Sequence, residues 1–183
     1  MNRRTGVTVA LFLSMLVACA SQPAAAPKPV VEKEKVGVYD SRAIIIAYAG
    51  SAHFNAWLTD LRAKNEKARA DGDEKTVNAT EEEGQARQRK MHSQGFSTAP
   101  VDDILAVIQA RLPEIAKKAG VGPLISKWDK AALAKYPGAE QVDVTMALVE
   151  ALEPNERQLK VIAEMMKTEP LPLEEVEKMS VDE

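Results

Sequence analysis

The chain has little of what catalytic and metal sites require. Its 183 residues include one cysteine, two histidines and few aromatic side chains. A single cysteine excludes an intrachain disulfide. His53 and His92 stand far apart, without acidic or cysteine partners at metal-ligand spacing. Since no glycine-rich phosphate loop, nucleophile elbow or HExxH motif occurs, we expect a non-enzymatic protein with no catalytic residues, no metal and no cofactor.

The chain also has no excess of basic charge and no long apolar run. Its formal net charge is −3, and no basic stripe appears, so nucleic acid is not an expected partner. The longest apolar stretch, Val7 to Val17, is shorter than the roughly 20 residues that a membrane-spanning helix needs.

That stretch belongs instead to an expected signal peptide covering residues 1–18. Arg3 and Arg4 precede it and small residues follow it, as in a cleavable export signal. Leu16-Val17-Ala18-Cys19 resembles the lipobox of bacterial prolipoproteins. We therefore predict cleavage before Cys19 and lipidation of its thiol; the alternative is an ordinary signal peptide with an incidental cysteine. Cleavage takes the net charge from −3 to −5, because two arginines leave.

Residues 19–34 are expected to form the lipidated cysteine and a tether. Three prolines among small and charged residues cannot form a core and favour an extended chain. Ala20 follows the cysteine where enteric-type inner-membrane retention uses aspartate. We therefore expect a bacterial envelope protein, anchored to the lipid bilayer through Cys19, on the outer membrane facing the periplasm.

Ordered structure is expected from Lys35 onward. The β-branched and aromatic residues between Val36 and Tyr48 predict a strand. Gly50-Ser51 ends it and offers a helix cap. An apolar stripe at helical spacing follows, from Phe54 to Leu61.

The next stretch, Arg62 to Gly95, has only Val77 and Met91 as large apolar side chains. Asp71-Gly72-Asp73 predicts a turn within it. Such a polar segment is a solvated helical hairpin, a partly disordered excursion or a surface that meets a partner.

A second ordered part follows. Ser97 to Pro100 predicts a helix start, and an apolar stripe runs to Ala119, with a kink at Pro113 and a stop at Gly120. Pro123 to Trp128 predicts a second strand, and Ala131 to Tyr136 a possible third. Val142-Asp143-Val144-Thr145 leads into a short helix. Residues 153–183 are expected to hold a C-terminal helix and an acidic, proline-containing tail.

The order of these elements resembles the Skp (OmpH-like) family of periplasmic chaperones. The resemblance rests on Lys35 to Asp40 as the first strand, Ile104 to Gly122 as a returning arm, Pro123 to Trp128 as the second strand and Val142 to Val149 as the closing helix. It covers residues 35–152, with a helical arm at about 51–119.

The resemblance implies a mostly helical α+β fold, in which a helical-hairpin arm is flanked by a small sheet. It implies a homotrimer whose strands, near Val36–Val38 and Leu124–Trp128, form one barrel. Its arms would enclose unfolded outer-membrane proteins, with their tips at Ala63 to Gly95.

Two functions are therefore considered first. One is an envelope-anchored holdase chaperone that binds polypeptides through the arm. The other is a structural or adaptor lipoprotein that links a membrane to another envelope component. A small-molecule site is a third, and Trp57 and Trp128 are interpreted as core residues rather than as its markers.

Overall fold

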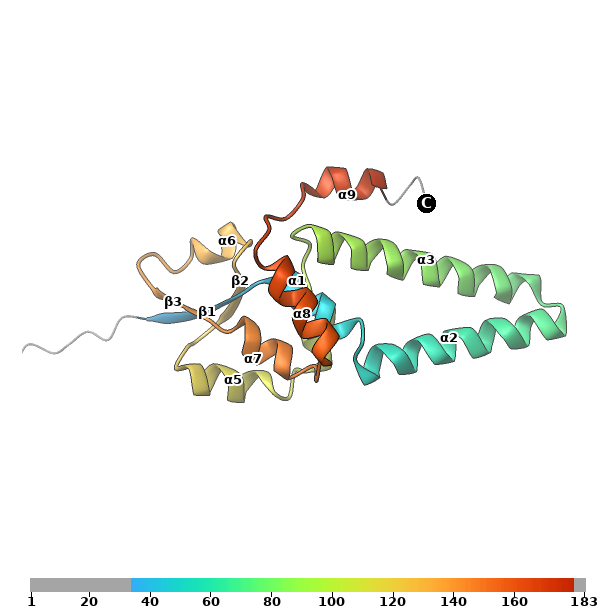
Figure 1. Ribbon diagram of the computed structural model, residues 1–183, viewed down its shortest axis with the longest axis horizontal. Coiled ribbons are helices and arrows are strands. Elements are labelled where there is room, and N and C mark those ends of the chain that lie inside the picture. The colour runs from blue at the N-terminus through green and yellow to red at the C-terminus, as the bar shows by residue number, and fades with distance from the viewer. Residues whose placement is uncertain (1–33, 180–183) are drawn as a thin grey trace, which may run out of the picture. The chain divides into compact units, whose positions relative to one another are not determined.

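The computed structural model describes residues 34–179. The predicted signal peptide, Cys19 and the tether as far as Lys33 lie outside the described residues. Within them the chain is mostly helical and has one small parallel sheet, which confirms the α+β expectation (Figure 1). None of the helices described between Glu34 and Met179 is both long and apolar enough to cross a membrane.

The sheet has three parallel strands, β1 (Lys35–Tyr39), β2 (Leu124–Ser126) and β3 (Glu140–Asp143). The strand order is β2-β1-β3, so the first strand lies in the middle. Val38 pairs with Ile125 on one side and with Asp143 on the other. Because all three strands run in the same direction, their carboxyl ends meet at one edge of the sheet.

The expected third strand at 131–136 is wrong. Helix α6 (Lys130–Leu133) occupies part of it, because the Asp129 carboxylate accepts a hydrogen bond from the Ala132 amide at 2.8 Å and caps the helix. The third strand begins only at Glu140, after the left-handed Gly138.

The first strand is also shorter than expected. It stops at Tyr39, and the residues that follow form helix α1 (Ser41–Tyr48). Asp40 caps this helix by accepting a hydrogen bond from the Arg42 amide at 3.0 Å. Every side chain of α1 except Ile46 is buried. A helix that is buried on all sides shows no amphipathic period, which explains why its β-branched residues predicted a strand.

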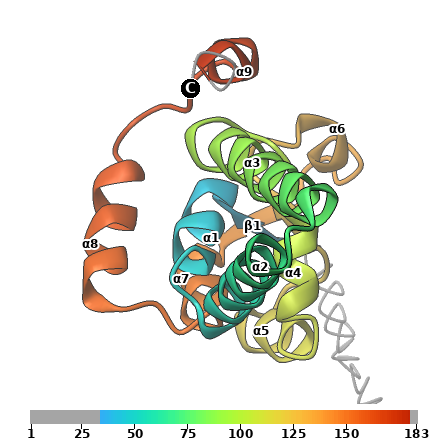
Figure 2. The ribbon, with the colours of Figure 1, turned by 90° about the vertical axis from the view of Figure 1, so that its right-hand side faces the viewer.

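The polar stretch forms a helical hairpin, one of the three alternatives. Helices α2 (Ala52–Asp71) and α3 (Glu74–Phe96) lie side by side (Figures 1 and 2). Ser51 caps α2, and the predicted turn is confirmed, with Gly72 in the left-handed conformation and Asp73 capping α3. The helix that returns from the turn is therefore α3.

The segment from Ile104 to Gly122, expected as the returning arm, forms two short helices, α4 (Asp102–Val107) and α5 (Leu112–Ala119). Pro113 lies in the first turn of α5, so the predicted break near proline is confirmed, as is the stop at Gly120. The expected hydroxyl cap is wrong, because Ser97 ends α3 and α4 begins only at Asp102. The apolar stripe of this segment packs on the core and not along the hairpin.

The core surrounds α1. It is built from α1, α4, the helix after β3, α7 (Thr145–Glu150), and α8 (Glu156–Met165). The Gln158 side chain on α8 donates hydrogen bonds to the carbonyls of Ile46 and Ala47, at 2.8 and 2.9 Å, and so closes the end of α1. The last helix, α9 (Leu173–Met179), packs on α3 (Figure 2).

Candidate functional site

The two helices of the hairpin are joined near their turn by polar contacts. Asn65 on α2 donates a hydrogen bond to the Thr80 hydroxyl at 2.7 Å. Arg69 and Glu81 form an ion pair across the helices at 2.5 Å. Only Leu61, Ala68, Thr80 and Gln94 are buried on these two long helices. The hairpin is therefore held by a narrow seam and presents most of its surface to solvent.

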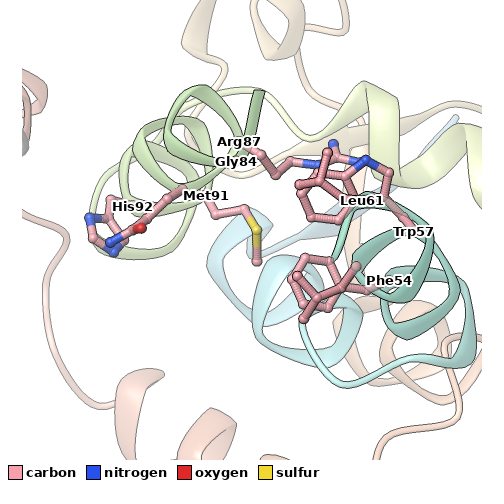
Figure 3. A pocket seen from close by; sticks show the side chains of 9 residues that line it. Phe54, Trp57, Leu61, Gly84, Arg87, Met91 and His92 are labelled. Atoms are coloured by element: carbon pink, nitrogen blue, oxygen red, sulfur yellow. The ribbon is translucent and has the colours of Figure 1, made fainter. Parts of the chain in front are cut away.

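Between the turn and the core, the helices separate enough to leave an open cavity of about 350 Å³, here called the hairpin groove (Figure 3). Helix α2 contributes Phe54, Trp57, Leu58 and Leu61, and α3 contributes Gly84, Arg87, Gln88, Met91 and His92. The Met91 side chain reaches from α3 into the space between the helices (Figure 3). The lining is thus aromatic and aliphatic, with cationic and amide groups at its edge.

A glycine in the middle of α3 contributes to the shape of the groove. A Cβ at Gly84 would lie 3.6 Å from the nearest atom of Leu61. Glycine in a helix interior costs about 1 kcal/mol relative to alanine. Because Gly84 has no side chain, Leu61 of α2 approaches the backbone of α3 at this point of the groove.

The aromatic rings of the groove are held in place by neighbouring groups. The Phe54 and Trp57 ring centroids are 5.6 Å apart, and the Arg87 guanidinium lies 4.9 Å from the Trp57 ring centroid. Arg87 also donates a hydrogen bond to the Tyr48 hydroxyl at 3.2 Å, and Trp57 donates its indole N–H to Glu83 at 3.0 Å. Cation–π and hydrogen-bond contacts of this kind fix the rings in one orientation.

Asp103 connects the groove to the core. Its carboxylate forms ion pairs with Lys90 at 2.8 Å and Arg87 at 3.5 Å, and it accepts a hydrogen bond from Gln94 at 2.9 Å. Burial alone would raise the pKa of the Asp103 carboxyl, but the contacts from Lys90 and Gln94 and the charge of Arg87 lower it below its ordinary value. The base of α3 is therefore anchored to α4.

A second charged cluster lies at the carboxyl ends of the strands. Asp40 is fully buried. Its carboxylate accepts hydrogen bonds from the Arg42 guanidinium at 2.9 and 3.1 Å and from the Trp128 indole at 3.2 Å. It also forms an ion pair with Lys127 at 2.8 Å. The Asp40 amide donates to the Thr145 hydroxyl at 3.0 Å. Because both carboxylate oxygens are occupied, this cluster joins the elements together and offers no free group for chemistry.

The histidines noted in the sequence lie on different elements. His53 is at the start of α2, 6.3 Å from the Tyr48 ring, and His92 lies on α3, 5.5 Å from the Phe96 ring. Nowhere in residues 34–179 do three histidine, cysteine or acidic side chains gather as a metal site would require.

The interpretation of the tryptophans as core residues is wrong. Trp57 lines the hairpin groove, and Trp128 lines a second cavity beside the sheet. Sequence reasoning also missed Gly84 and Arg87 as groove residues. The available signal was their spacing with Met91, since positions 84, 87, 88 and 91 lie on one face of a helix.

Comparisons with protein-family models, curated protein sequences and solved structures find no match to the chain. The resemblance to the Skp family therefore depends on the sequence pattern alone. The hairpin groove is a structural observation that does not depend on this resemblance, and a function can be proposed from it.

Proposed function

We propose that the protein is a lipid-anchored, non-enzymatic polypeptide-binding module of the bacterial envelope, similar to periplasmic holdase chaperones. The hairpin groove is the observation that carries this proposal. It joins the aromatic rings of Phe54 and Trp57 and the side chain of Met91 with the charged Arg87.

An unfolded outer-membrane protein is the proposed client. The groove has a volume of about 350 Å³, and the unbranched Met91 can adapt to side chains of different shapes. Each aromatic ring of the groove can bury a large apolar area when a client side chain packs against it. Such a groove would bind many sequences weakly, which suits a chaperone that must release its client.

The resemblance also supports a trimer. Within one chain β1 pairs with β2 and β3, so each outer strand of this sheet has an edge without a partner strand in the described residues. Unpaired edges favour association with another chain. We propose that three chains assemble through their sheets, so that three hairpins surround one client.

The proposed anchor is the acylated Cys19. Replacing Cys19 with serine removes the thiol that the thioether needs, so the variant should remain unlipidated and accumulate as precursor. Metabolic labelling with a fatty-acid analogue in the producing bacterium measures this. Label retained on Cys19→Ser would contradict the lipoprotein proposal.

The adaptor function remains the second candidate. Large apolar side chains are exposed at the end of α3 and in the C-terminal part of the chain, with Phe96 52%, Val161 47% and Leu173 41% exposed. These residues lie outside the hairpin groove and could contact another envelope component.

An aggregation assay separates the two candidates. The described residues 34–179 belong to one compact unit and contain the core, so a chain of residues 32–183 is used for the test. At several-fold excess this unit should delay the aggregation of an unfolded outer-membrane β-barrel, measured by light scattering. Trp57→Ala combined with Met91→Ala should remove most of the delay, because two of the largest groove side chains are lost.

The matched control is Leu159→Ala combined with Val161→Ala, which also removes two large apolar side chains, outside the groove. Circular dichroism establishes that each variant is folded. If the control loses protection and the groove variant keeps it, the client site lies on α8. If the unchanged protein gives no delay, the chaperone proposal is wrong and the adaptor takes its place.

A further inference from the structure

A second cavity, of about 290 Å³, lies at the carboxyl ends of β1 and β2. The residues that matter for its chemistry are Tyr39, Asp102, Leu124, Ser126, Trp128 and Asp129. They come from the ends of two strands, from the start of α4 and from the cap of α6. The carboxyl edge of a parallel sheet is where ligands bind in open α/β folds, and the volume is near the lower end of the roughly 300–1,000 Å³ of small-molecule pockets.

The Tyr39 hydroxyl has no partner. The side chain is only 6% exposed and lines the cavity, yet its hydroxyl makes no hydrogen bond to any residue between Glu34 and Met179. The Tyr39 hydroxyl is not among the buried side-chain atoms that lack a partner, so it is open to the cavity that Tyr39 lines. It is therefore available to donate to, or accept from, a ligand there.

Two exposed carboxylates, Asp102 and Asp129, border the cavity without an ion-pair partner among the described residues. Burial first, and then the charges of Asp102 and Asp129, raise the pKa of Tyr39 to about 12. Asp102 forms no ion pair with any described residue, and Asp129 only accepts the cap hydrogen bond from Ala132. The cations beside Trp128, Arg42 and Lys127, are both bound to the Asp40 carboxylate.

We propose that this cavity binds an organic cation, a guanidinium or primary ammonium group, between the carboxylates of Asp102 and Asp129 and the hydroxyl of Tyr39. A guanidinium fits best, because its five N–H donors lie in one plane and can reach acceptors on several walls. The aromatic and aliphatic walls, Trp128 and Leu124, contact the apolar part of the same molecule. This site is separate from the hairpin groove and does not depend on the proposed chaperone function.

Two guanidinium probes test the site and distinguish its sources. Agmatine represents a free amine, and Nα-acetyl-arginine amide represents an arginine of a peptide; Nα-acetyl-citrulline amide is the neutral counterpart. Binding to residues 32–183 is followed by calorimetry and by the fluorescence of Trp128 in a Trp57→Phe background. We expect both guanidinium probes to bind, with the citrulline compound at least tenfold weaker because it lacks the charge.

Three variants locate the site. Asp102→Asn and Asp129→Asn should each weaken binding of agmatine about tenfold, and Asn at position 129 can still cap α6. Tyr39→Phe removes only the hydroxyl and should weaken binding about threefold. The control is Asp60→Asn, which removes the same charge from an exposed position on α2.

The outcomes decide the proposal. Equal affinity for the arginine and citrulline probes, or an effect of Asp60→Asn as large as that of Asp102→Asn, would overturn it. So would the absence of binding by either guanidinium probe at millimolar concentration. These results leave the hairpin groove untouched, so a failure here is distinguishable from a failure of the aggregation assay.

Discussion

At the scale of single residues, the fold depends most on one buried carboxylate. Burial opposes ionisation of Asp40, but the hydrogen bonds from Arg42, Lys127 and Trp128 and the charge of Arg42 outweigh it and lower the pKa of Asp40 from 3.8 to about 2. Arg42, which is 2% exposed, also donates a hydrogen bond to the Thr168 carbonyl at 2.9 Å. This pair thus joins β1, β2 and the segment after α8.

Asp40→Asn should destabilise the protein at neutral pH by about 3 kcal/mol or more, because the buried Arg42 loses its counter-charge. Since the folded-state pKa is depressed, the stabilisation from Asp40 is complete above about pH 4 and is lost as the pH falls through 2. It amounts to about 2 kcal/mol.

Denaturant unfolding between pH 2 and pH 7 measures both effects. The free energy of unfolding of Asp40→Asn should fall less between pH 7 and pH 2 than that of the unchanged protein, because the variant has no Asp40 carboxylate to protonate. Asp60→Asn, an exposed carboxylate, is the control and should follow the unchanged protein. A stability difference below 1 kcal/mol at pH 7 would show that the cluster contributes little.

At the scale of elements, the sequence predicted what depends on local chemistry. Ser51 and the turn around Gly72 were predictable because caps and left-handed glycines are set by neighbouring residues. Helix α1 was not, because it is buried on nearly all sides and shows no period. The cavity beside the sheet was not either, because Tyr39, Asp102 and Asp129 come from three elements that only the folded chain brings together.

Two glycines of the hairpin should respond in opposite ways to alanine. Gly72 has φ of +71°, where an alanine costs about 1 kcal/mol, so Gly72→Ala should destabilise the hairpin. Gly84 lies inside α3 with ordinary van der Waals space for a Cβ, so Gly84→Ala should stabilise it by about 1 kcal/mol.

Hydrogen exchange of the α2 and α3 amides measures this local stability. About fivefold faster exchange in Gly72→Ala and fivefold slower exchange in Gly84→Ala is the expected result. If both variants exchange at the same rate, the backbone preferences of these two glycines do not determine the local stability of the hairpin.

At the scale of the whole molecule, the main prediction is self-association. Residues 32–183 should form trimers, because the three-stranded sheet has an edge on each side available to another chain. Static light scattering at tens of micromolar gives the mass directly. A monomer at that concentration would contradict the trimer. The variant Gln141→Pro, on the outer strand β3, should dissociate a trimer that uses this edge, because proline lacks the backbone N–H that would donate a hydrogen bond to a strand of another chain.

The strand order also determines which parts of a newly synthesised chain can fold first. The middle strand is made first, but its partner residues come late, since Lys35 pairs with Glu140, 105 positions further along. The hairpin needs only near neighbours and can form at once, whereas the sheet must wait for nearly the whole chain. Long-range pairing of this kind slows folding. Consequently β1 emerges long before the strands that flank it, and until then its apolar residues are open to chaperones and proteases.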